Sequence, residues 1–192
     1  AVLAQKTGLR FAEGVKSDDL DAAIAASTKG GTVISSTGEL KHNASKGIFT
    51  VDTGRTQGFA AVNPEGPVSL SNVQVEFENE FAVVTVTALE EKSIAEGVGL
   101  LVTALGNTVN RGMVRSFTGD RIVDKGGMPL LIEPILGAVK VFGLAGDLSG
   151  IKVYALDASG QRTSEVNAEV KGDSISFKME AASKAMYYEI AR

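Results

Sequence analysis

Short runs of alternating apolar and polar residues follow one another from residue 32 to the end of the chain. A period of two is typical of strands with one buried face, and turn residues such as Gly, Asn and Asp separate the runs. The connections are too short for crossover helices and favour antiparallel pairing. We expect strands at residues 32–36, 39–42, 47–53, 56–62, 68–70, 73–78, 81–88, 99–104, 114–116, 130–133, 138–142, 152–156, 166–170, 174–179 and 186–191.

Two neighbouring runs indicate how these strands pack. The run 73–78 alternates strictly, which predicts one buried face and one acidic, solvent-exposed face. The run 81–86 is almost continuously apolar, as expected for a strand covered on both faces. Together they favour a mainly β fold, an antiparallel β-sandwich of the jelly-roll or immunoglobulin-like kind. The expected core residues are Phe49, Val51, Val75, Phe77, Val83 and Leu101.

One segment has the period of a helix. Ser17 precedes a group of acidic residues, and Leu20, Ala23 and Ile24 then share one face at helical spacing. Acidic side chains in a first turn and a serine cap stabilise a helix N-terminus, and two glycines after Lys29 end the pattern. We therefore predict one short N-terminal helix over residues 17–27.

The turn-rich stretch 144–150 divides the strand pattern. We expect a linker and helix over residues 1–31, a β-sandwich over 32–143, and hairpin-rich strands over 144–192. The last part forms either a subdomain or the closing strands of the same sandwich. The loop 157–160, with its terminal glycine, predicts a hairpin within this part.

Composition excludes several classes of function. Of the 192 residues, 44% are hydrophobic and 22% are charged, which is ordinary for a globular domain. No apolar run approaches the roughly 18 residues of a membrane span. The net charge is -4 and the basic residues form no run, so we expect no nucleic-acid partner and no membrane partner. The chain has no cysteine, which excludes disulfides and thiolate metal sites.

The sequence contains no recognisable catalytic centre. His42 is the sole histidine, and no nucleophile-elbow motif accompanies it. The chain has enough carboxylates for glycoside hydrolysis, but nothing in their spacing selects a pair. The carboxylates considered are Asp52, Glu76, Glu78, Glu80, Asp120, Asp124 and Glu133. We expect no catalytic residue, no metal ligand and no cofactor, and no turnover by this chain alone.

Aromatic residues are the natural candidates for sugar binding, because sugar rings stack on aromatic faces. The chain has no tryptophan, and most phenylalanines fall at alternating strand positions typical of a core. Tyr187 and Tyr188 are adjacent on one strand, so one of them should point outward. Phe117 lies in a glycine-containing loop that could expose it. The candidate ligand-binding residues are Tyr187, Tyr188, Tyr154 and Phe117.

Two long segments, 33–40 and 47–58, carry a family resemblance. They are similar to a pattern that follows the catalytic barrel in some multidomain bacterial glycoside hydrolases. Further similar segments occur in the same order at residues 110–113, 129–134, 153–157, 160–162 and 187–190. The chain thus resembles the C-terminal non-catalytic β-sandwich module of such enzymes. It departs from the pattern at Lys41-His42, where an aromatic residue is expected, and at Gly54, where a proline is expected.

The resemblance implies a secreted or periplasmic bacterial protein and a partner in the preceding catalytic domain of the same polypeptide. It also implies an accessory module that binds carbohydrate weakly or buttresses the catalytic barrel, with polysaccharide as a candidate partner. The alternative is a purely structural or protein-interaction domain that binds no glycan. We further expect Arg55 to hydrogen-bond a carbonyl or a carboxylate where two strands reverse.

Overall fold

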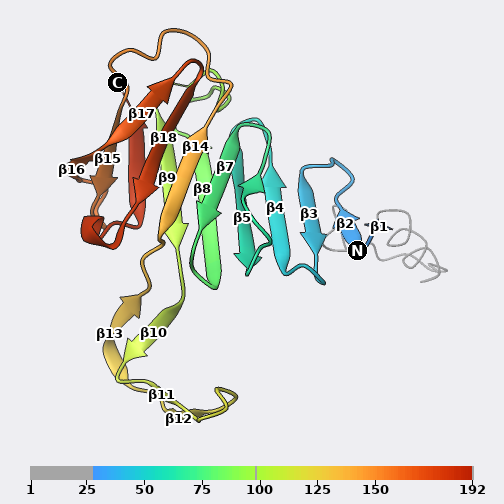
Figure 1. Cartoon of the computed structure of the whole chain (residues 1–192), viewed down its shortest axis with the longest axis vertical. Coiled ribbons are helices and arrows are strands. Elements are labelled where there is room, and N and C mark those ends of the chain that lie inside the picture. Colours follow the sequence, from blue (N-terminus) through green and yellow to red (C-terminus); the bar gives the residue numbers. More distant parts are fainter. Residues whose placement is uncertain (1–27, 98, 192) are drawn as a thin grey trace, which may run out of the picture.

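The computed structural model describes residues 28–97 and 99–191, and these are built almost entirely of antiparallel strands (Figure 1). The prediction of a mainly β, antiparallel fold is therefore confirmed. The helix predicted over residues 17–27 lies outside the described residues. Within them, one short 3-10 turn, η1 (Ala181–Ser183), precedes the last strand.

The larger sheet has ten strands in the order β1-β2-β3-β4-β5-β8-β9-β19-β15-β16. Strands β1 to β5 form a simple meander, and the C-terminal strands β15, β16 and β19 complete the sheet beyond β9. The ten strands are β1 (Thr28–Lys29), β2 (Thr32–Ile34), β3 (Leu40–Asn43), β4 (Ile48–Asp52), β5 (Thr56–Val62), β8 (Phe81–Ala88), β9 (Leu100–Leu105), β19 (Tyr187–Ala191), β15 (Lys152–Leu156) and β16 (Arg162–Val166).

The smaller sheet has five strands in the order β17-β18-β14-β7-β6. Its members are β17 (Ala168–Lys171), β18 (Ser174–Met179), β14 (Gly137–Val141), β7 (Val73–Phe77) and β6 (Val68–Ser69). The strand predicted at 166–170 is wrong in one respect. Strand β16 ends at Val166 and β17 begins at Ala168, so the chain crosses at Asn167 from one sheet to the other.

The two sheets share one hydrophobic core and so form a sandwich. Aromatic pairs join them: Phe59 of β5 stacks on Phe77 of β7 at 5.6 Å between centroids, and Phe177 of β18 lies 5.2 Å from Tyr188 of β19. Alternating residues of both sheets fill the space between these pairs, as expected for aligned sheets. The central buried side chains include Val73, Val75, Val84, Val86, Leu100, Val102, Val139, Val141, Ile175 and Ile190.

A buried amide also ties the sheets together. Gln57 of β5 is 1% exposed, and its side chain contacts the turn between β6 and β7. Its Oε1 accepts from the backbone N–H of Asn72 at 2.7 Å, and its Nε2 donates to Oδ1 of Asn72 at 3.1 Å. The Asn72 amide in turn donates to the carbonyl of Phe142. Because each of these groups is paired, this polar bridge is compatible with burial.

Four of the predicted core residues lie on the opposite face of the larger sheet. In β8, Val84 and Val86 are buried, whereas Val83 is half-buried and points away from the core. Phe49, Val51 and Leu101 share the face of Val83, by strand register. The prediction that β8 is covered on both faces is therefore wrong for the described residues, because the smaller sheet covers one face only. Val75 is buried as predicted, and Phe77 is partly buried against the core.

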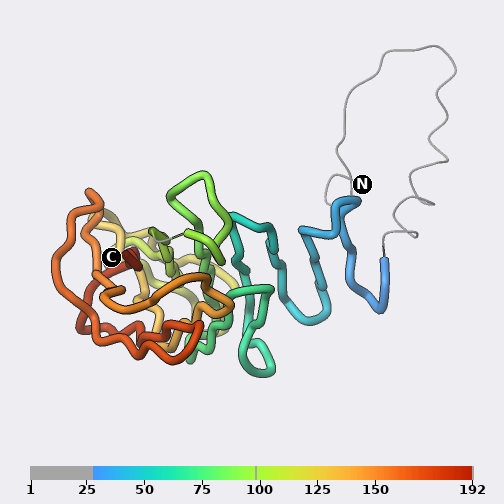
Figure 2. Tube along the Cα trace, turned by 90° about the horizontal axis from the view of Figure 1, so that it is seen from above, coloured from blue at the N-terminus to red at the C-terminus, as the bar shows by residue number. Residues whose placement is uncertain are grey.

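The first strands of the larger sheet extend beyond the sandwich. Figure 2 shows the segment with β1 to β4 continuing as a single layer past the smaller sheet. The turn between β4 and β5 is held by Thr53, whose hydroxyl accepts from the N–H of Thr56 at 2.9 Å. Arg55 behaves as expected: its guanidinium donates to the backbone carbonyl of Glu90 at 2.7 Å.

A long two-stranded projection leaves the sandwich between β9 and β14 (Figure 1). We call residues 107–132 the arm. Its proximal part pairs β10 (Thr108–Arg111) with β13 (Gly127–Ile132), and its distal part pairs β11 (Val114–Arg115) with β12 (Ile122–Asp124). Strands β10 and β12 are not among the predicted strands, and β13 begins three residues before the predicted one.

Candidate functional site

The arm exposes an unusual amount of apolar surface. Phe117 at its tip is fully exposed, and every residue of β13 is exposed. Exposed apolar side chains scattered singly are ordinary, but many of them gathered on one projection are typical of an interaction site. The exposed large apolar side chains of the arm are Val114, Phe117, Ile122, Val123, Met128, Leu130, Leu131 and Ile132.

Polar contacts shape the tip of the arm. The backbone N–H of Ser116 donates to the carbonyl of Arg121 at 2.8 Å and closes the loop. The carboxylate of Asp120 accepts from the hydroxyls of Thr118 and Ser116, and these hydrogen bonds lower the pKa of Asp120. The loop therefore satisfies its own polar groups and leaves Phe117 directed outward, as the sequence suggested.

The base of the arm is anchored to the sandwich. Asn107 donates from its backbone and its amide to Oε2 of Glu133, at 3.3 and 3.2 Å. Gly106 packs so closely against this pair that a Cβ there would lie 2.6 Å from the carbonyl of Glu133. Asn79, in the β7–β8 turn, donates to the carbonyl of Pro134 and accepts from the N–H of Leu136. The arm thus leaves the sandwich in a defined direction.

The arm differs in charge from the rest of the chain. It contains Arg111, Arg115, Arg121 and Lys125 against Asp120 and Asp124, a net charge of +2. Because the whole chain has a net charge of -4, the remaining residues carry -6. The arm is therefore a basic, apolar projection on an acidic body.

The second unusual surface is the side of the larger sheet that faces away from the core, which we call the outer face. Its rows follow from strand register: Phe49, Ala60, Val83 and Leu105 lie side by side in one row. The next row contains Val51, Gly58, Thr85, Thr103 and Tyr187. Uncovered faces of antiparallel sheets usually carry polar residues. Here the central rows contain no charged side chain.

Two of the predicted ligand-binding residues occupy diagonal positions at one end of the outer face. Tyr187 and Tyr154 lie on neighbouring strands, and both are half-buried. The guanidinium of Arg162 covers one face of the Tyr154 ring at 4.1 Å, and its Nε donates to Glu189 at 2.6 Å. This hydrogen bond raises the pKa of Arg162. One end of the outer face therefore combines two aromatic rings with an ion pair.

Tyr188 cannot serve as a surface platform, which corrects its place among the predicted ligand-binding residues. It is 1% exposed and packs against Phe177 in the core. Its hydroxyl hydrogen-bonds that of Ser183 at 2.9 Å, and burial raises its pKa. The period of two along β19 directs Tyr187 outward and Tyr188 inward. The four predicted residues therefore occupy three separate places: the outer face, the core and, for Phe117, the arm tip.

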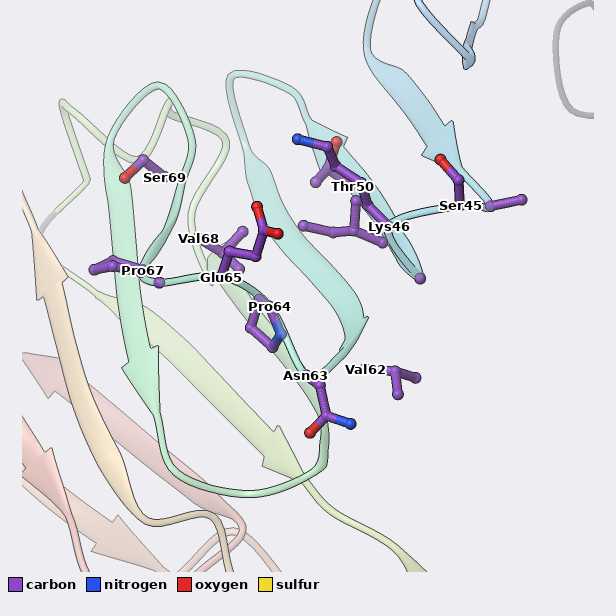
Figure 3. A pocket seen from close by; sticks show the side chains of 14 residues that line it. Ser45, Lys46, Thr50, Val62, Asn63, Pro64, Glu65, Pro67, Val68 and Ser69 are labelled. Atoms are coloured by element: carbon purple, nitrogen blue, oxygen red, sulfur yellow. The ribbon is translucent and has the colours of Figure 1, made fainter.

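An open groove of about 720 Å³ lies beside the edge strand β6. Figure 3 shows its two sides: the loop with Pro64 and Pro67, and the turn that carries Ser45 and Lys46. Glu65 and Lys46 are its charged lining residues. The lining contains neither a histidine nor a pair of carboxylates, so the groove offers no catalytic arrangement.

Two of the carboxylates considered for catalysis, Asp52 and Asp124, accept hydrogen bonds from residues in turns. Asp52 accepts from the backbone N–H and hydroxyl of Ser71, and Asp124 accepts from the N–H of Gly126. Glu76, Glu78 and Glu80 are exposed. Among the described residues, no group of three His, Cys, Asp or Glu side chains is arranged to hold a metal ion.

Comparison with protein families, curated proteins and solved structures finds no match. In residues 28–97 and 99–191, no helix is long and apolar enough to span a membrane. The function must therefore be argued from the arm and the outer face. Most of the arm is not predictable from the sequence, because the apolar residues near its base resemble a core strand. The available signal was the arm's density of glycines and basic residues between its apolar pairs.

Proposed function

We propose that this chain is a non-catalytic docking module that buttresses another protein surface through its arm. The observation that carries the proposal is the set of eight exposed apolar side chains between Val114 and Ile132. Burial of apolar surface contributes roughly 25 cal/mol per Å², so a partner that covers these side chains would be bound substantially by the hydrophobic effect.

The architecture of the arm supports a docking role. An isolated two-stranded ribbon is only marginally stable in water, because each strand lacks a neighbour on one side and a layer to pack on. The strands of the arm lack both a further neighbouring strand and a packing layer, and a docked partner would supply such a layer. The base of the arm is hydrogen-bonded to the sandwich through Asn79, which contacts Pro134 and Leu136, and this contact orients the arm. Such pre-organisation lowers the entropy lost on binding.

The proposal agrees with the buttressing role that the resemblance to accessory modules of bacterial glycoside hydrolases implies. In that setting the parent protein is a secreted or periplasmic enzyme, and the module contributes structure to it rather than chemistry. The small number of exposed aromatic residues favours protein contact over polysaccharide contact as the main role. Incubation of the purified chain with a polysaccharide panel should release no reducing ends.

Site-specific photo-crosslinking in the natural polypeptide tests the docking role. A photoreactive phenylalanine analogue replaces Phe117 or Val123 on the arm, and Lys140, exposed on the smaller sheet, serves as the matched control. We expect the arm positions to give reproducible crosslinked peptides from one protein surface, identified by mass spectrometry. Arm positions that react no more than position 140 would contradict the proposal.

Weak glycan binding is the second candidate function, because Tyr154 and Tyr187 lie together beside polar groups on an open face. One stacking ring contributes about 1–3 kcal/mol by analogy with base stacking, so binding would be weak. Affinity electrophoresis against xylan, β-glucans, mannans and cellulose tests it, with Tyr187→Ala beside the parent. Retardation that Tyr187→Ala abolishes supports this function, and no retardation on any glycan removes it.

A further inference from the structure

We infer that the arm of one copy docks on the outer face of a second copy of this chain. The inference rests on the proposed docking function and names its partner. It follows from two surfaces that no other part of the described chain covers. One is the projecting arm with its exposed apolar side chains, and the other is formed by the two uncharged central rows of the outer face.

The outer face has the composition of an interface. Phe49, Val51, Val83 and Leu101 are half-buried there, in positions where a solvated sheet normally carries polar side chains. Among the described residues, the smaller sheet packs on the opposite side of the larger sheet. Gly58 lies in the central row because strand β8 packs tightly against it: a Cβ there would lie 2.6 Å from the carbonyl of Val84. The row of Leu101 includes Glu189, but the two central rows carry no charge, so they can receive apolar side chains without desolvating a charge.

The arm does not lie against the outer face of its own chain. It leaves the sandwich at the ends of β9 and β14 and points away from both sheets (Figure 1). Its apolar side chains remain exposed, as they would not be if they packed on the same molecule. Contact between these two surfaces therefore requires a second molecule.

Charge favours another copy as that molecule. The arm has a net charge of +2 and the rest of the chain has -6. Two acidic bodies repel each other, but a basic arm is attracted to an acidic body, which steers this orientation over others. The basic residues of the arm, Arg115 and Arg121 among them, are exposed beside its apolar side chains.

The dimensions are also compatible. The five strands from β4 to β19 span about 24 Å, and five residues along each span about 16 Å. One strand of the arm, some 13 residues long, reaches about 40 Å when straight. A contact of about 24 by 16 Å covers about 380 Å² on each partner. If each copy docks its arm on the other, the two contacts together bury about 1,500 Å², which is the standard size of a stable protein interface.

Disulfide trapping tests the inference cleanly, because the chain contains no native cysteine. Val123→Cys on the arm is mixed with Thr85→Cys or Thr103→Cys, two neighbouring positions on the outer face. Lys140→Cys, on the outward side of the smaller sheet, is the matched control. We expect a mixed disulfide dimer with either outer-face variant and loss of that dimer with the control. The inference would be overturned if Lys140→Cys gave as much mixed disulfide dimer as the outer-face variants. It would also be overturned if neither outer-face variant formed that dimer.

A measurement without cysteines guards against a variant that fails to fold. Light scattering on the unmodified chain should show a mass that rises with concentration, and Val123→Glu should remain a monomer with unchanged circular dichroism. A monomer at every concentration would overturn self-docking. If the photo-crosslinks then lead to a different protein, the docking function stands without self-association. If they lead to no protein surface, both proposals fail.

Discussion

The sandwich and the arm use similar residues in opposite ways. Leu100 in β9 is 1% exposed, whereas Leu131 in β13 is 46% exposed, although both lie in paired antiparallel strands. The sandwich strands have a second sheet across from them, and the arm strands have none. Backbone pairing alone therefore does not bury a strand. The apolar residues of the sandwich are buried between two sheets, whereas those of the arm stay exposed, and this exposure is what the proposed docking role explains.

The largest expected effect comes from truncating one leucine in each region. Leu100→Ala should lower the free energy of unfolding by about 2–5 kcal/mol, because it removes transfer energy and leaves a cavity in the core. Leu131→Ala should change it by no more than about 0.5 kcal/mol, as for an ordinary surface substitution. Urea unfolding measured at a dilution that keeps the chain monomeric compares the two. Equal losses would mean that the arm is part of the folding core.

A smaller effect is expected at the polar bridge between the sheets. Gln57→Leu should lower the free energy of unfolding by about 1–3 kcal/mol, because it leaves the backbone N–H and the side-chain amide oxygen of Asn72 without their Gln57 partner. The matched control is Gln74→Leu, since Gln74 contacts only the exposed Ser69 hydroxyl in the described contacts and faces solvent. Thermal unfolding of both variants checks this. A neutral Gln57→Leu would show that the bridge is not needed to hold the sheets together.

The smallest effect concerns acid stability, where each region has a comparable loop. Asp157, between β15 and β16, accepts from the hydroxyl of Ser159 and from the backbone N–H groups of Ser159 and Gln161, which lower its pKa. Because the folded pKa lies below the unfolded one, this stability is present above about pH 4 and is lost as pH falls through the folded pKa.

Asp157→Asn should therefore flatten the fall of melting temperature below about pH 4. Asp120→Asn removes a carboxylate from the arm tip whose pKa is also lowered, by hydrogen bonds from Thr118 and Ser116. We expect it to leave the melting curve unchanged, since the arm can open without unfolding the sandwich. Melting curves from pH 2 to 7 (~0.5 steps) distinguish the two variants. A matching response from Asp120→Asn would mean that the arm unfolds together with the sandwich.

The sequence predicts the strands of the sandwich well because their apolar residues alternate and glycines separate them. It does not predict which apolar side is covered. Val83 and Val84 are equally apolar neighbours, and only the position of the smaller sheet makes one of them the core residue. Phe49 and Val51 were placed in the core for the same reason.

The arm escaped prediction for a related reason. The segment 130–133 has the composition of a buried strand, and nothing local distinguishes it from a core strand such as β14. Its exposure follows from pairing with β10 alone, which is a long-range property. Period-two alternation predicts that one of the adjacent residues Tyr187 and Tyr188 points outward, whereas Tyr154 is a candidate only because the chain has few other aromatic residues outside the expected core. The proximity of Tyr154 and Tyr187 depends on the pairing of β15 with β19.

Amide hydrogen exchange at two protein concentrations tests most directly whether the arm depends on a partner copy. The account predicts that β9 stays protected at both concentrations, while β13 exchanges rapidly in dilute solution and slowly where copies associate. The comparison is internal, because both strands belong to the same molecule. Protection of β13 equal to that of β9 at the lowest concentration would show that the arm is stable alone. Rapid exchange of β13 at every concentration would show that no second copy covers it.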